Sequence, residues 1–183
     1  MRNKKFKLLI IFAAVLLAAA GCVRYSLYNV LFPKKYSDIV EKYAAVYCLD
    51  DHFVYSVIKA ESNFNADAVS HKGAKGLMQI TDSTGRWAAE MIGIEGYEDS
   101  MLFDPDTNIK IGCWYLNRLI EQYGNRDTAV AAYNAGSGNV SSWLDQMGSN
   151  SNELIKELIP FEETRNHVDK INLYLKIYNM LYK

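Results

Sequence analysis

Apolar side chains recur at steps of three and four residues through most of the chain, and this spacing constrains the fold more than any other feature. Such steps collect residues on one face of a helix, whereas a half-buried strand needs strict alternation, which no stretch of five or more residues shows convincingly. The expected helices cover residues 36–47, 84–91, 109–124, 127–135, 140–147 and 162–182, and one further helix is capped by Asp50 or Asp51 and stops at about Asn63. The sequence therefore predicts a mainly α protein, with at most a short hairpin around residues 77–80 inside a loop at 63–83.

The first 24 residues differ in composition from the rest. They hold five of the 20 Lys and Arg residues and no Asp or Glu, and the basic residues flank an apolar run of 16 residues from Leu8 to Val23. A basic start followed by an apolar run is typical of an export signal. We expect a signal anchor or lipoprotein segment at 1–24, a connector at 25–38 and one folded domain at 39–183.

The fate of this N-terminal segment has more than one solution. The stretch from Ala18 to Cys22 resembles a bacterial lipoprotein box, in which Cys22 is lipidated, although Ala19 stands where such boxes prefer Leu. Without cleavage, the segment stays as a signal anchor with its basic end inside, and a cleaved, fully secreted form is the third possibility. The first two fates place Tyr25 and everything after it on the outer face of the cell membrane.

Charge and cysteine content exclude other classes. The residues after the N-terminal segment are acidic in balance, which argues against a nucleic-acid partner. His52, His71 and His167 lack metal-ligand spacing, so no metal and no cofactor are expected. Cys48 and Cys113 either pair or are buried free thiols.

Glu61 is the most unusual residue of the predicted helices. It follows Val57 by four residues and Ile58 by three, so its side chain leaves the apolar face. Desolvation disfavours the ionised form of a carboxylic acid, and the negative end of the helix dipole acts in the same direction. The alternative is a glutamate that reaches solvent or pairs with a Lys. We hypothesise that Glu61 is a general acid.

Four short motifs follow one another along the chain. They are Glu61-Ser62, the loop from Gly73 to Ile80, the run from Ala132 to Gly136 and the stretch from Ile159 to Arg165. With Asp104-Pro105, Asn108-Ile109, Gly112 and Tyr115-Leu116, they closely resemble the soluble lytic transglycosylases, glycoside hydrolase family 23, over about residues 39–182. The resemblance implies a lysozyme-like (goose-type) helical lobe with a substrate cleft.

The resemblance also implies an activity. Members of the family cleave the β-1,4 bond between N-acetylmuramic acid and N-acetylglucosamine in peptidoglycan without water, leaving 1,6-anhydromuramyl ends. Glu61 is then the catalytic acid and afterwards the base, and the residues that contact substrate are Ser70, Gln79, Tyr133, Asn134, Glu163 and His167. His167 stands where relatives usually carry Tyr, which adds a group that titrates near neutrality, so activity is expected to fall on acidification.

The sequence as a whole indicates a membrane-tethered enzyme, monomeric, whose partners are peptidoglycan glycan strands and the membrane. A hydrolytic muramidase on the same fold is the alternative within enzymes. A wall-binding protein without catalysis is the alternative from another class.

Overall fold

The computed structural model describes residues 2–146 and 159–183, and the chain divides into two compact units, Met1–Lys35 and Tyr36–Lys183. The first unit is the helix α1, Arg2–Ser26, which continues into the π-helical segment η1, Leu27–Leu31. By length and composition the stretch Phe6–Leu31, 26 residues, could cross a membrane, and no part of its most apolar window is buried. The helix therefore extends well beyond the apolar run that ends at Val23.

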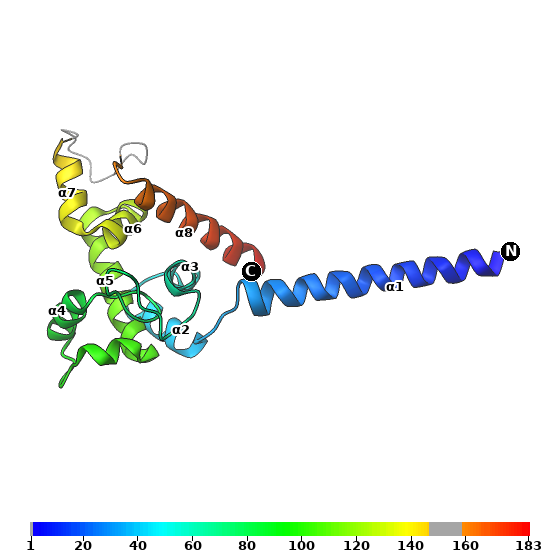
Figure 1. Ribbon diagram of the computed structural model, residues 1–183, viewed down its shortest axis with the longest axis horizontal. Helices are drawn as coiled ribbons and strands as arrows, with labels where there is room; N and C mark the ends of the chain where they lie inside the picture. Colours follow the sequence, from blue (N-terminus) through cyan, green and yellow to red (C-terminus); the bar gives the residue numbers. More distant parts are fainter. Residues whose placement is uncertain (1, 147–158) are drawn as a thin grey trace. The chain divides into compact units, whose positions relative to one another are not determined.

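The second unit is a bundle of helices (Figure 1). Its elements are α2 (Ser37–Val46), α3 (Asp51–Ser62), α4 (Asp82–Ile92), the 3₁₀ helix η2 (Asp99–Phe103), α5 (Pro105–Tyr123), α6 (Arg126–Ala135), α7 (Ser137–Gln146) and α8 (Glu162–Leu181). Within the described residues there is no named strand, so the mainly α prediction is confirmed. The hairpin considered at 77–80 is reduced to isolated antiparallel bridges, Val69 with Lys75 and Lys75 with Ile80.

The helix ends follow the capping residues that the sequence supplies. Asp50 accepts a hydrogen bond from the Phe53 backbone N–H at 2.9 Å and begins α3, and Asp104 does the same for Thr107 at 2.9 Å at the start of α5. A carboxylate at this position satisfies a backbone donor that has no partner inside the helix. At the other end of α5, Gly124 has φ +65°, a left-handed conformation that suits glycine.

Three features differ from the predicted helix pattern. The 3₁₀ helix η2 was not predicted, α5 begins at Pro105, four residues earlier than expected, and α7 begins at Ser137, three residues earlier than expected. Gly136, at φ +90°, ends α6, and Val140 donates its backbone N–H back to the Gly136 carbonyl. Because the backbone turns on a single glycine, α7 follows α6 almost without a connecting loop.

The core lies where α3 and α5 meet their neighbours. α3 packs against α2 and α8, while α5 packs against α2, α4 and α6. Side chains with no exposed surface come from each of these elements, among them Val57, Ile58, Ile109, Leu116 and Tyr178. The C-terminal end of α3 is therefore enclosed on several sides, and residues there are largely removed from water.

The long loop between α3 and α4 is fastened to α5 by Asn108. This fully buried side chain donates hydrogen bonds to the carbonyl oxygens of Lys75 (3.0 Å) and Leu102 (2.7 Å), and its oxygen accepts from the Met78 backbone N–H at 2.7 Å. A buried amide with all three bonds made stabilises one arrangement of the loop. Gly112 lets the loop approach, because a Cβ there would lie 2.3 Å from the Met78 sulfur.

Candidate active site

Glu61 lies in the last turn of α3, and Asn63 ends the helix in a left-handed conformation with φ +50°. The Glu61 side chain is 14% exposed, and Val57 and Ile58 on the preceding turn are completely buried. The carboxylate is thus close to the negative end of the helix and mostly shielded from bulk water.

Glu61 opens onto a pocket of about 160 Å³. Three parts of the chain line it: the loop 63–81, the end of α6 and the start of α8. The lining residues are Glu61, Ser70, His71, Lys72, Ala74, Gln79, Thr81, Tyr133, Asn134 and Glu163. The structure thus brings together six of the seven residues that the sequence predicts for the site, and it adds His71, Lys72, Ala74 and Thr81.

Tyr133 joins α6 to the loop between α3 and α4. Its phenol donates a hydrogen bond to the Met78 carbonyl oxygen at 2.6 Å. Burial raises the pKa of Tyr133 well above its usual value of 10, and the nearby charge of Glu61 acts in the same direction. The phenol therefore stays protonated and uncharged, and it keeps its hydrogen bond to the Met78 carbonyl oxygen.

Asn134, next along α6, is tied to α8. Its side-chain oxygen accepts a hydrogen bond from the Thr164 hydroxyl at 2.8 Å, and Thr164 is almost completely buried. This bond fixes the orientation of the Asn134 amide and joins the two helices that form one side of the pocket.

Gln79 and Ser70 shape the loop. Gln79 has φ +49°, unusual for a residue other than glycine, and its amide nitrogen donates to the carbonyl oxygens of Gly76 (2.9 Å) and Ala68 (3.2 Å). Because these bonds use both amide hydrogens, the Gln79 carbonyl oxygen is the group free to meet a ligand. The Ser70 hydroxyl accepts from the Ala74 backbone N–H at 3.0 Å and closes the turn before Gly76.

Glu163 and Lys72 lie at the pocket opening. Glu163 Oε2 is 3.8 Å from Lys72 Nζ, and the two side chains are 68% and 63% exposed. An ion pair in water of this kind adds little to stability. The pair is therefore free to separate when a charged ligand approaches.

His167 is placed differently from the other predicted residues. It is not among the pocket-lining residues but lies against Glu61, with Nε2 3.1 Å from Glu61 Oε1 and a side chain 9% exposed. In the part of the chain that the structure describes, no group makes a well-directed hydrogen bond to this nitrogen. The two atoms are thus at ion-pair distance, but their geometry is not that of a directed hydrogen bond.

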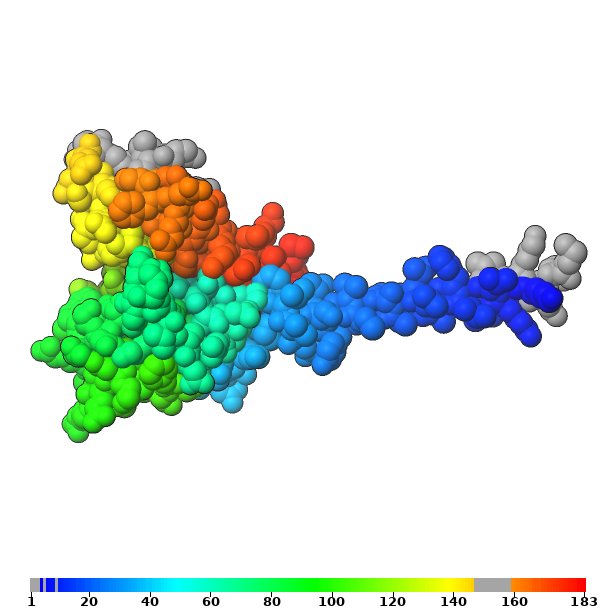
Figure 2. Space-filling model, viewed as in Figure 1, coloured from blue at the N-terminus to red at the C-terminus, as the bar shows by residue number. Residues whose placement is uncertain are grey.

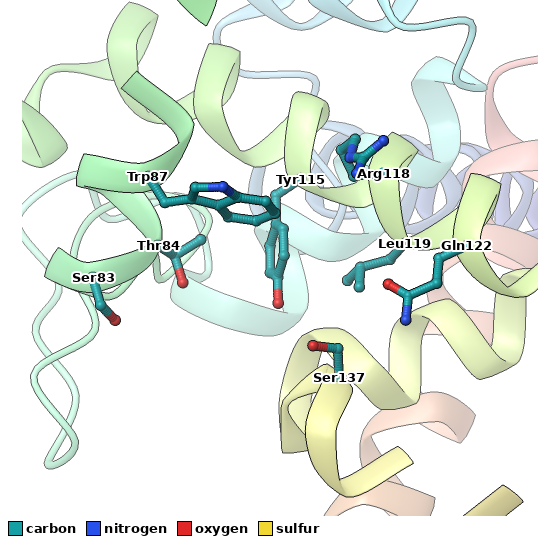
Figure 3. Close-up of a pocket in the computed structure, with 8 residues that line it drawn as sticks. All are labelled: Ser83, Thr84, Trp87, Tyr115, Arg118, Leu119, Gln122 and Ser137. Atoms are coloured by element: carbon teal, nitrogen blue, oxygen red, sulfur yellow. The ribbon is translucent and has the colours of Figure 1, made fainter. Parts of the chain in front are cut away.

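The pocket continues into a groove. A second cavity of about 280 Å³ shares Lys72, Gln79, Thr81, Tyr133 and Asn134 with the first, and it reaches Thr84 and Tyr115. A third, also of about 280 Å³, shares Thr84 and Tyr115 and ends at Trp87, Arg118 and Gln122 (Figure 3). The three cavities form one path from Glu61 to Trp87.

Aromatic rings and polar side chains line the far end of this groove. The Trp87 ring, 42% exposed, lies edge-on to Trp114 at 4.8 Å between centroids and to Tyr115 at 6.1 Å. On the face seen in Figure 2, the green atoms of α4 and its neighbouring loops lie below the yellow and orange atoms of α7 and α8. Sequence reasoning did not assign Trp87 to the site; a large exposed aromatic on α4 was the feature that could have indicated it.

Over residues 2–146 and 159–183, one group of side chains could hold a metal ion. Asp50, Asp51 and His52 place ligand atoms within 4.8 Å of one another at the start of α3. Asp50 caps the helix, and His52 Nδ1 lies 2.8 Å from Asn179 Oδ1. The open question about the thiols is answered too, because Cys48 is exposed, Cys113 is buried and both are free.

A helical lobe in which a shielded glutamate borders an open groove is typical of lysozyme-like proteins that act on glycans. The chain belongs to the transglycosylase SLT domain family, which matches residues 38–156. The family expected from the four motifs is therefore confirmed.

Individual relatives agree with this assignment. The chain is 37% identical to the soluble lytic murein transglycosylase of Escherichia coli K12 over 146 residues, 78% of this chain and 23% of that protein. It is 31% identical to the membrane-bound lytic murein transglycosylase C of Sodalis glossinidius over 79% of this chain and 46% of the relative. The chain thus spans about a quarter to a half of the length of these relatives.

Solved structures share the fold. An inactive mutant of the lytic transglycosylase Slt from Pseudomonas aeruginosa superposes with a TM-score of 0.75 at 34% identity, over 83% of this chain and 25% of that one. The 70-kDa soluble lytic transglycosylase of Escherichia coli gives a TM-score of 0.74 at 35% identity, over 81% and 25%.

Proposed function

We propose that this chain is a peptidoglycan lytic transglycosylase. It cleaves the β-1,4 bond between N-acetylmuramic acid and N-acetylglucosamine without water and leaves a 1,6-anhydromuramyl end. Family membership and relatives named murein transglycosylases support the proposal. The observation that carries it is the placement of Glu61, shielded from water but lining a pocket with Gln79, Tyr133 and Asn134.

In this proposal one carboxyl group is enough for the chemistry. Glu61 gives its proton to the bridging oxygen as the glycosidic bond breaks, while the oxygen of the substrate's own 2-acetamido group attacks the anomeric carbon. The 6-hydroxyl oxygen then displaces that acetamido oxygen, and Glu61 takes the hydroxyl proton. The enzyme ends with the same number of protons as at the start, which is the requirement of acid and then base catalysis.

The groove supplies binding along the glycan strand. Trp87 and Tyr115 offer apolar ring surfaces of the kind that stack on sugar rings, and Arg118 and Gln122 offer hydrogen-bond donors. Nearer to Glu61, the Gln79 oxygen accepts from a hydroxyl or acetamido group, and Asn134 and Ser70 border the same pocket.

Glu163 is the other carboxylate among the residues that line the pocket. Its role distinguishes a transglycosylase with one catalytic carboxylate from a hydrolase with two. A hydrolytic muramidase with two carboxylates uses the second to activate water or to form a covalent bond. Glu163 is two-thirds exposed and lies beside Lys72, which suits contact with charged groups on the substrate's peptide. We propose that Glu163 binds substrate and has no part in bond cleavage.

The experiment is digestion of purified sacculi by the full-length chain in detergent, followed by mass spectrometry of the released fragments. Anhydro ends are expected. Reducing ends would identify a hydrolytic muramidase, and absence of soluble fragments would refute an enzymatic role.

Glu61→Gln tests the residue that carries the proposal. The variant keeps the shape of the side chain but has no proton to donate, so release is expected to fall by about 10²- to 10⁴-fold. Glu90→Gln is the matched control, since Glu90 is exposed on α4 and lines none of the three cavities. Release by Glu61→Gln at the rate of this control would remove Glu61 from the mechanism.

We also propose that α1 tethers the enzyme to the cell membrane, with the folded unit outside and facing the wall. The support is a helix of sufficient length and hydropathy with exposed apolar side chains, and a basic N-terminus that favours the inner side. Relatives named membrane-bound transglycosylases are consistent with this location.

A further inference from the structure

His167 and Glu61 form a contact that the proposed reaction has not yet used. His167 projects from the second turn of α8 against the last turn of α3, and its Nε2 atom lies 3.1 Å from Glu61 Oε1. Both side chains are largely removed from water, at 9% and 14% exposure. In such surroundings a charge on one group strongly affects proton binding by the other.

Other charged and titratable groups lie on the elements that pack together here or line the same pocket. They are Lys59 on α3, Tyr133 on α6, Glu163, Arg165, Asp169 and Lys170 on α8, and His71 and Lys72 on the loop. Several bind elsewhere: Lys170 donates to the Ala60 carbonyl at 2.7 Å, and Lys59 donates to Asn63 at 2.8 Å. Over residues 2–146 and 159–183, His167 is the one basic group within ion-pair distance of Glu61.

We propose that Glu61 and His167 hold the catalytic proton jointly, with His167 as a positioning residue for Glu61 that does not itself contact substrate. The inference rests on the proposed transglycosylase function. With one proton, the pair exists either as carboxylic acid and neutral imidazole or as carboxylate and imidazolium. Two groups coupled at this distance titrate as a unit, so the proton belongs to the pair.

The proton count is the same as in the proposed reaction. Glu61 passes the proton to the bridging oxygen as that bond breaks, which leaves a carboxylate beside a neutral ring. When the 6-hydroxyl oxygen bonds to the anomeric carbon, the hydroxyl proton returns to Glu61. The working enzyme therefore starts with one proton on the pair, and activity is present below the pH at which the pair loses it.

This direction differs from the expectation based on histidine alone. Acidification that charges His167 leaves the proton inside the pair, where it can move back to Glu61 before it is donated. The limit that His167 sets is therefore on the alkaline side, and the imidazole extends activity to higher pH than an isolated carboxyl group allows.

The first test is the pH profile of fragment release by the full-length chain. In His167→Phe, which offers no proton-binding group, and His167→Tyr, whose phenol donates to the carboxylate and stabilises its charge, the alkaline limb is expected to move to lower pH by about one unit or more. His52→Gln is the control, because His52 lies on α3 but far along it from Glu61, against Asn179. An alkaline limb that does not move in either folded His167 variant overturns the inference.

The second test needs no turnover and no substitution at His167. The chain has three histidines, so histidine-selective isotope labelling gives three ring signals, assigned with His52→Gln and His71→Gln. His167 is expected to titrate about one pH unit or more higher in the wild-type chain than in Glu61→Gln. Equal midpoints would overturn the joint-proton proposal.

The two tests separate this inference from the function on which it rests. If His167 and Glu61 titrate together but no anhydro ends are released, the joint-proton inference stands and the proposed transglycosylase function is refuted. If anhydro ends are released and depend on Glu61, but the His167 midpoints are equal and the alkaline limb does not move, the transglycosylase function stands. The joint-proton inference is then refuted.

Discussion

Single residues fix the geometry of the loop between α3 and α4. Gly76 has φ +74°, and a Cβ there would lie 2.2 Å from the Leu102 carbonyl oxygen and 2.3 Å from the Asn108 amide nitrogen. Both contacts are with atoms already used in hydrogen bonds that hold the loop on α5. The glycine is therefore needed for two independent reasons, its backbone conformation and the space it leaves.

Gly76→Ala is expected to destabilise the folded unit by about 2–4 kcal/mol, because strained backbone and a steric clash add. Gly73→Ala is the matched control, since Gly73 has φ +77° but nothing within 4 Å of its hypothetical Cβ. That change is expected to cost about 1 kcal/mol, the backbone part alone. Thermal unfolding of both variants measures the difference, and equal losses would show that the close approach does not matter.

Glu163→Gln removes a negative charge from the pocket opening. Release is expected to continue with anhydro ends, within about tenfold of the wild-type rate, because the Glu163 charge is solvated and its pair with Lys72 contributes little. Mass spectrometry of the products and the initial rate decide the outcome. A loss as large as that in Glu61→Gln would make Glu163 a second catalytic carboxylate.

At the scale of elements, the crossing of helices far apart in sequence assembles the site. α3 packs against α8, and α6 packs against both α5 and α8. The first contact sets His167 beside Glu61, and the second sets Tyr133 and Asn134 opposite the loop. The groove then follows the edge between α4 and α5 (Figure 3).

Trp87→Ala tests this groove. Loss of the exposed ring is expected to raise KM for glycan strands about threefold to tenfold with little effect on kcat, because stacking of one aromatic ring contributes about 0.5–1.5 kcal/mol. Met91→Ala is the control: Met91 is on the same helix, 58% exposed and outside the cavity. An unchanged KM in Trp87→Ala would confine binding to the part of the groove near Glu61.

At the scale of the whole molecule, the chain consists of an exposed apolar helix and a folded helical unit. The helix runs through Cys22 to Ser26 and on into η1, and a helix of about 20 residues is already long enough to span a membrane. An uncleaved signal anchor and a lipoprotein precursor both carry such a segment, so the chemistry at Cys22 is what separates them.

Cys22→Ser distinguishes the two. If the helix alone anchors the chain, the variant stays in the membrane fraction and keeps the mass of the wild-type chain, with Cys48→Ser as the control, since Cys48 is an exposed thiol of the folded unit. Fractionation and intact-mass measurement are the readouts. Release of Cys22→Ser from the membrane, or a lipid-modified wild-type chain, would establish lipidation at Cys22.

Much of the fold could be predicted from local sequence. The cap Asp50 and the terminator Gly124 act within one turn of the chain, so both ends of α3 and the end of α5 were predicted to within about two residues, whereas α5 begins at Pro105, four residues before its predicted start. The 3₁₀ helix η2 was not, since it forms where Leu102 is held by Asn108 and not through its own periodicity. The start of α7 was missed because one glycine, Gly136, replaces a loop.

The candidate site divides in the same way. The resemblance of four motifs, in order, to the lytic transglycosylases implied Glu61, Gln79, Tyr133 and Glu163 together. Trp87 was missed, because exposure on a helix and continuity of a groove depend on neighbours brought from elsewhere.

By itself, the sequence determined most of the helices, the cap at the start of α3, the apolar N-terminal segment and, through its four motifs, the family, since each depends on residue type and short-range spacing. Only the tertiary structure decided the geometry of the contact between His167 and Glu61, 106 positions earlier in the chain: Nε2 lies 3.1 Å from Oε1, and His167 does not line the pocket. That contact arises where α3 and α8 pack together, because the packing of two helices far apart in sequence depends on the whole core and not on short-range spacing.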